Sequence, residues 1–190
     1  MIRRLPILPT IIVLAAAATM VALGFWQLQR LDEKEALIAR YQRVLGDETA
    51  VPYPRSDAAA ELALYRRSTV YCDQVIERRG GAGRSAAGES GIAQIATCRL
   101  DGGGTTDIAL GFSRNPDPVA WAGGEIGGIV APGPRLVADP PIAGLEPLAK
   151  PDPTDLPNNH LAYAGQWFFF ALTALVIYGL AIRKRLREQA

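Results

Sequence analysis

Residues 161–182 read LAYAGQWFFFALTALVIYGLAI, an apolar run without a single charged side chain. At a rise of about 1.5 Å per residue, such a run crosses a hydrocarbon core of about 30 Å as one helix. A similar run, ILPTIIVLAAAATMVALGFWQL, occupies residues 7–28. The two runs predict a membrane protein with two transmembrane α-helices, one on each side of an outer segment at residues 29–160.

The average composition hides this pattern. A net charge of +1 and an apolar content of 49% would suit an ordinary soluble domain. The first run also fits a secretory signal peptide, because Arg3 and Arg4 precede it and it contains small residues. A span is favoured, since the run continues through Trp26 into a further helical pattern at residues 32–43.

Basic residues flank both runs on the side away from the central segment. Clusters of this kind remain in the cytoplasm. Both termini are therefore expected there, as a short segment at residues 1–6 and a basic tail at residues 183–190. The central segment is then periplasmic, and the protein lies in a bacterial inner membrane. The basic residues concerned are Arg3, Arg4, Arg183, Lys184, Arg185 and Arg187.

The central segment predicts a mainly β (α+β) domain. Alternation and β-branched content predict strands at residues 67–75, 91–100, 105–112 and 126–130.

The remaining central stretches are expected to lack packed elements. Residues 51–57 contain two prolines and are interpreted as a linker. The glycine-rich stretches 80–88 and 102–104 are expected to be hairpin loops, because neither has the spacing of a phosphate-binding loop. The proline-rich stretch 131–157 predicts an extended return to the membrane rather than a packed element.

Cysteine use is sparse. Cys72 and Cys98 each lie in a predicted strand, and no close C-x-x-C pair or nearby histidine suggests a metal site. In an oxidising compartment the two could form a disulfide. Two free buried thiols are the alternative.

The sequence argues against an enzyme. Its single histidine, His160, stands at the membrane boundary, so a Ser-His-Asp or Cys-His site in the outer domain is excluded. Zinc-ligand motifs are also missing. A hydrolytic activity is therefore not expected. A nucleic-acid partner is not expected either.

Polar and aromatic residues gather where each run meets the outer side. Residues 24–31 read GFWQLQRL, and residues 157–167 read PNNHLAYAGQW. In a two-span hairpin both stretches lie at the outer ends of the spans, so we expect them to be neighbours. Asn158 or Asn159 is expected to cap the second helix. Four residues of that helix lie at i, i+3, i+4 and i+7 and so share one face: His160, Tyr163, Ala164 and Trp167.

These stretches resemble motifs of the surfeit locus protein 1 family of cytochrome c oxidase assembly factors. The resemblance rests on G-x-W-Q-x-x-R-L at residues 24–31 and N-N-H-L-x-Y-A at residues 158–164, each beside a span. The family's L-V-N-R-G-W-V-P segment is matched only loosely by IALGFSRNP at residues 108–116. Detail in the outer domain therefore follows less closely from the resemblance.

The resemblance implies a role in maturing the haem-containing subunit of cytochrome c oxidase, together with other assembly factors and within the lipid bilayer. It also implies binding of haem a, with His160 as the axial ligand to the haem iron. Imidazole nitrogen is a standard axial ligand to haem. The further candidate haem-binding residues are Trp26, Gln27, Arg30, Tyr163 and Trp167, with Lys34 as a second cation for the propionates.

Other interpretations of the same residues remain open. Trp26, Tyr163 and Trp167 fit an interfacial aromatic belt, and Arg30 fits a snorkelling anchor. Gln27 fits a polar contact between the helices, as does Gln166. The alternative function is a structural scaffold for oxidase assembly that binds no haem. A sensor is less attractive, because the short cytoplasmic ends leave no output module. The oligomeric state is open, because a second protomer could supply a second axial ligand.

Overall fold

The computed structural model describes residues 6–133, 135–142 and 144–188. The predictions made for Arg3, Arg4 and the final two residues of the tail lie outside this part of the chain. The chain divides into two compact units. Of the described residues, 6–38 and 157–188 belong to a helical unit, and a β unit lies within residues 39–156.

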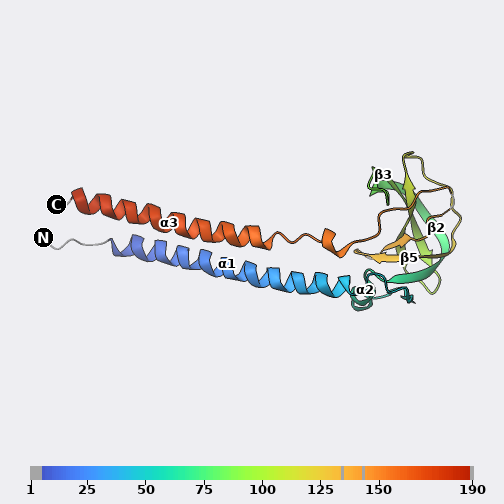
Figure 1. Ribbon diagram of the computed structural model, residues 1–190, viewed down its shortest axis with the longest axis horizontal. Helices are drawn as coiled ribbons and strands as arrows, with labels where there is room; N and C mark the ends of the chain where they lie inside the picture. Colours follow the sequence, from blue (N-terminus) through green and yellow to red (C-terminus); the bar gives the residue numbers. More distant parts are fainter. Residues whose placement is uncertain (1–5, 134, 143, 189–190) are drawn as a thin grey trace. The chain divides into compact units, whose positions relative to one another are not determined.

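The helical unit contains two long helices, which run side by side in Figure 1. Helix α1 covers Ile7–Gln42 and helix α3 covers His160–Glu188. Both are long and apolar enough to cross a membrane, as predicted. Helix α1 has 36 residues, which corresponds to about 54 Å at the α-helical rise. Because a hydrocarbon core measures about 30 Å, its last turns extend beyond that core, as the pattern at residues 32–43 predicted.

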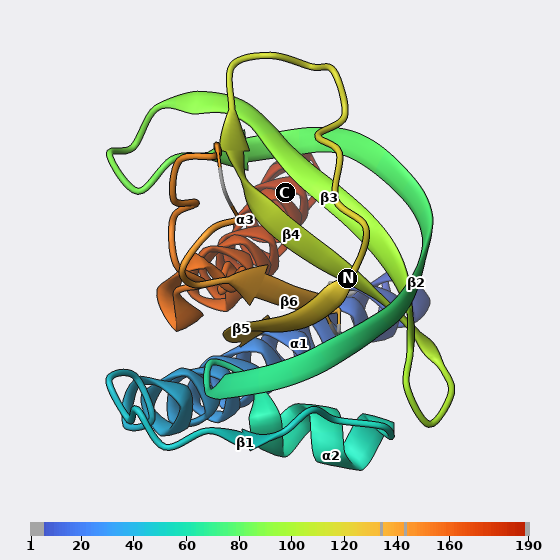
Figure 2. The ribbon, with the colours of Figure 1, turned by 90° about the vertical axis from the view of Figure 1, so that its right-hand side faces the viewer.

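The β unit is built around a strongly curved sheet (Figure 2). Its order is β1-β2-β3-β4-β6-β5, and β2 also pairs with β5, so strands β2 to β6 close into a barrel. The long strand β2 makes closure possible, because its first residues pair with β5 and the rest pair with β3. Strands β4 and β6 are parallel, and β1 adds to β2 in parallel. The strands are β1 Val51–Pro52, β2 Arg67–Arg84, β3 Ser90–Leu100, β4 Thr105–Ser113, β5 Gly124–Ala131 and β6 Arg135–Ala138.

The predicted strands are all present, but the glycine-rich stretch 80–88 is not wholly a loop. Strand β2 continues to Arg84, and the turn begins only after it. The absence of a side chain at Gly83 lets the neighbouring strand approach closely, because a Cβ there would lie 2.7 Å from the Ala93 nitrogen of that strand. The loop at 102–104 does connect β3 to β4, as predicted.

Two further stretches differ from the prediction. Residues 51–57 are not a plain linker, since they contain β1 and lead into helix α2, Asp57–Ala63, which the Ser56 hydroxyl caps by accepting from the Ala59 N–H. The proline-rich stretch 131–157 contains strand β6, whose Leu136 is fully buried. It also contains the short 3-10 helix η1, Pro153–Asp155. Prolines flank β6 without interrupting it, so a packed strand forms there.

The barrel interior holds the main apolar core. A disulfide joins Cys72 of β2 to Cys98 of β3 inside it, with a Cα–Cα distance of 5.5 Å. The bridge resolves the choice between a disulfide and two free thiols. The buried members of the core are Ala63, Val70, Cys72, Ala96, Cys98, Leu100, Ile108, Leu110, Ile126, Val130, Leu136 and Ala138.

One buried polar side chain organises the loop after β4. Gln94 is 1% exposed. Its Nε2 donates to the carbonyls of Asn115 and Asp117, and its Oε1 accepts from the Val119 N–H. A buried amide with all of these partners costs little, so the loop is tied to the barrel wall.

Candidate functional site

The two helices of the helical unit pack antiparallel over most of their length. Near one end, the Thr10 and Tyr178 hydroxyls are 2.5 Å apart. Near the other, Gln27 Oε1 lies 2.7 Å from His160 Nδ1. The residue numbers rise along α1 as they fall along α3, which sets the register of the pair.

Small residues form the contact between the helices. Ala17 and Ala171 are buried, and so are Gly24 and Ala164. In each helix the two positions are seven residues apart, the repeat that keeps one seam facing a partner helix. Small side chains let membrane helices approach closely. At Gly24 the approach is close, because a Cβ there would lie 2.5 Å from the Phe168 ring.

His160 is the first residue of α3 and is partly buried. Its Nδ1 is hydrogen-bonded to the amide oxygen of Gln27, which is also partly buried. Gln27 therefore does make a polar contact between the helices, and its partner is the histidine. Gln166, the other candidate for such a contact, is exposed.

The predicted ligand face of α3 is divided in the structure. His160 and Trp167 are partly buried and Ala164 is 1% exposed. Tyr163 is 51% exposed, and so is Trp26 of α1. Both rings therefore present open apolar surface, which suits lipid or a bound apolar group alike.

The cation predicted to meet an anionic ligand has a partner of its own. Arg30 Nη1 lies 2.5 Å from Glu33 Oε2, three residues further along α1, and both side chains are about half exposed. Exposed pairs of this kind are typically worth about 0.2–1 kcal/mol. The guanidinium is therefore readily available to a stronger anion.

The start of α3 differs from the predicted cap. Asn159 precedes the first helical residue, and its backbone carbonyl accepts from the Tyr163 N–H. The Asn158 side chain does not cap: within the described part of the chain its Oδ1 is buried without a hydrogen-bond partner. A buried acceptor without a donor is costly, so this end of the helix has an unmet polar group close to His160 in sequence.

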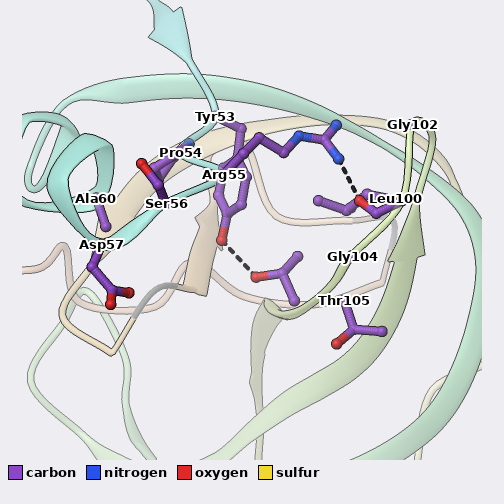
Figure 3. A pocket seen from close by; sticks show the side chains of 12 residues that line it. Tyr53, Pro54, Arg55, Ser56, Asp57, Ala60, Leu100, Gly102, Gly104 and Thr105 are labelled. Atoms are coloured by element: carbon purple, nitrogen blue, oxygen red, sulfur yellow. Dashed lines mark hydrogen bonds between the residues drawn. The ribbon is translucent and has the colours of Figure 1, made fainter.

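A separate pocket of about 470 Å³ lies in the β unit (Figure 3), between residues 53–60 and the β3–β4 loop. Sequence reasoning missed it, because it is formed by the presumed linker and a hairpin. Its polar groups are hydrogen-bonded to each other. The Tyr53 hydroxyl lies 2.5 Å from the Thr106 hydroxyl. Arg55 donates to the carbonyls of Gly103 and Asp101. Burial raises the pKa of the Tyr53 phenol above its usual value, so it remains neutral. This arrangement braces the hairpin.

The part of the chain that the structure describes contains no cluster of side chains typical of a metal centre. Among the described residues, no group of three or more histidine, cysteine, aspartate or glutamate side chains could hold a metal ion. Among the candidate site residues predicted from the sequence, His160 and Gln27 are hydrogen-bonded to each other within the helical unit.

The sequence matches the model of one known protein family over most of its length. The sequence model of the SURF1 family matches residues 14–172. The chain belongs to the SURF1 family. The match includes both motif stretches, residues 24–31 and 158–164, and so confirms the resemblance found in the sequence. A search of curated proteins finds no match.

SURF1 family membership agrees with the observed architecture, in which one long apolar helix precedes the β unit in the sequence and another follows it. The family is associated with the assembly of cytochrome c oxidase, and its members are assembly factors rather than enzymes. Together with the two helices, this places the protein in a membrane.

Proposed function

We propose that this SURF1 family protein binds haem a through His160 and helps to insert it into the haem-containing subunit of cytochrome c oxidase, without itself catalysing a reaction. The observation that carries the proposal is the hydrogen bond between Gln27 Oε1 and His160 Nδ1. A metal-bound histidine almost always has its second ring nitrogen engaged in this way.

The residues around His160 fit a haem. One imidazole supplies one axial nitrogen, which is all that a carrier needs from the protein. Trp26 and Trp167 offer apolar ring surface, as does Tyr163, and Arg30 offers a charge for the propionates. Bound haem a would contribute its iron and porphyrin as cargo. The protein's part is to bind, orient and shield the cofactor until the oxidase subunit receives it.

The proposed location is a bacterial inner membrane with both termini in the cytoplasm. The basic residues at the end of α3 support this orientation, because such clusters remain on the cytoplasmic side. The Cys72–Cys98 disulfide supports a periplasmic β unit, because disulfides persist in oxidising compartments. Its partners there are the haem-containing oxidase subunit and other assembly factors.

The proposal is tested in cells that synthesise haem a and lack their own copy of the gene. The cells are complemented with the wild type or with His160→Ala. We expect His160→Ala to reach the membrane at normal levels, to be purified with several-fold less haem a, and to leave the oxidase subunit depleted of haem. Absorption spectra of both proteins provide the readout, and Gln166→Ala is a control at an exposed site on the same helix.

A scaffold that holds no haem gives a different result. Wild-type protein would then be free of haem in these cells, while oxidase assembly still required it. His160→Ala would support assembly as well as the wild type does. That outcome would overturn the proposed function.

A further inference from the structure

The hydrogen bond between the two helices carries information about the proton on His160. Oε1 of Gln27 is a carbonyl oxygen and can only accept, so the hydrogen of the 2.7 Å contact belongs to Nδ1. A neutral imidazole carries one N–H. Nε2 is therefore the nitrogen with a free lone pair.

We infer that Gln27 is a positioning residue, which holds His160 in the Nδ1–H tautomer and so leaves Nε2 as the nitrogen that binds iron. The binding of iron by Nε2 rests on the proposed function. The tautomer of His160 does not, because it is a property of the protein without haem. In metal sites generally, the hydrogen bond at one ring nitrogen decides which nitrogen binds the metal.

The chemical nature of the partner suits a cargo that must be released. A carboxylate partner would make a charge-assisted hydrogen bond and strongly raise the basicity of the ligand nitrogen. Gln27 is a neutral amide, so it fixes the ring with a weaker effect on basicity. Glu33, an acidic side chain further along α1, is paired with Arg30 instead.

The packing of the helices keeps Gln27 opposite His160. Gly24 lies three residues before Gln27 and meets the Phe168 ring, and Phe25 makes an edge-to-face contact with the same ring, at a centroid distance of 5.4 Å. Sliding one helix by a single turn would displace the amide by about 5.4 Å, which is far beyond hydrogen-bond reach. The tautomer is thus coupled to the helix register.

The single histidine makes the tautomer directly measurable. The full chain is labelled with [15N]histidine, purified without haem in lipid nanodiscs, and examined by nitrogen NMR. Every histidine signal comes from His160. We expect a protonated Nδ1 and an unprotonated Nε2 in the wild type. Gln27→Leu, which has no acceptor, should shift the population toward Nε2–H, and Gln27→Glu should restore Nδ1–H.

The matched control is Gln29→Leu, the same substitution at an exposed position two residues further along α1. It removes a contact with Glu33 and should leave the His160 signals unchanged. A wild-type spectrum with the proton on Nε2, or a Gln27→Leu spectrum identical to the wild type, would overturn the inference.

Haem binding provides the second readout. Loss of an outer partner typically lowers metal affinity by about 10- to 100-fold, and we expect that loss in haem a titrations of Gln27→Leu. In the reduced haem complex, resonance Raman should show a lower iron–histidine stretching frequency in Gln27→Leu and a higher one in Gln27→Glu. Equal affinity and equal frequency in all three proteins would overturn the role of Gln27. A wild type with the Nδ1–H tautomer that never binds haem would overturn the proposed function instead.

Discussion

Gly128→Ala is expected to destabilise the β-barrel strongly. Gly128 lies in β5 and pairs on one side with Ser68 of β2 and on the other with Ala138 of β6. A Cβ there would lie 2.2 Å from the Val137 carbonyl oxygen. The neighbour is backbone within a strand pair, so it cannot move aside without breaking the ladder that closes the barrel.

The expected loss is large relative to ordinary stability. Overpacking of a core typically costs about 1–3 kcal/mol and occasionally more. For a backbone clash at the strand that closes the barrel, we expect a loss of unfolding free energy of about 3 kcal/mol or more. A typical domain is stable by about 5–15 kcal/mol, so a loss of about 3 kcal/mol would remove roughly a fifth to three fifths of such stability. Protease resistance of the full chain over a temperature series measures it.

Gly127→Ala is the matched control. It introduces the same methyl group one position earlier, where the nearest atoms to a Cβ are Thr69 Oγ1 at 3.7 Å and the Ser68 carbonyl oxygen at 3.9 Å. We expect this variant to resist protease as the wild type does. Equal resistance of Gly128→Ala and Gly127→Ala would contradict the closed-barrel arrangement.

Removal of the disulfide is expected to have the second-largest effect. Cys72 and Cys98 are separated by 26 positions in the sequence. Closing a loop of this size in the unfolded chain corresponds to about 3.5 kcal/mol in the chain-entropy model. For the β unit, we expect the double variant Cys72→Ala/Cys98→Ala to lower the Tm by roughly 10–20 °C.

The measurement is thermal unfolding of the purified full chain under non-reducing conditions. Wild type that has been unfolded and refolded in reductant should match the double variant, because both lack the cross-link. A double variant with the Tm of the oxidised wild type would show that the bridge does not constrain the barrel.

Local patterns in the sequence were sufficient to predict the helices and most strands. Long uncharged runs predict spans through their length alone, and β-branched alternation located strands β2 to β5. Glycine and proline misled the prediction, since both were interpreted as breaks. Gly83 instead serves close packing in β2, and β6 forms between prolines. The closure of β2 on β5 depends on contacts far apart in the sequence, which no local pattern reveals.

The candidate site shows the same division between local and distant information. Motif position placed Gln27 and His160 at the same level of the two spans. Their hydrogen bond could not be predicted, because it depends on the helix register set by Gly24 and Phe168. The disulfide partners could be named from the sequence, but the choice between bridge and free thiols needed the register of β2 and β3.

The central claim is that His160 ligates the iron of haem a. The most direct measurement is pulsed electron paramagnetic resonance of the full chain labelled with [15N]histidine and loaded with ferric haem a. Because His160 is the single histidine, a hyperfine coupling between the iron and 15N identifies it as the ligand. We predict such a coupling in the wild type and its absence in His160→Ala. Haem bound to the wild type without a 15N coupling would contradict the account.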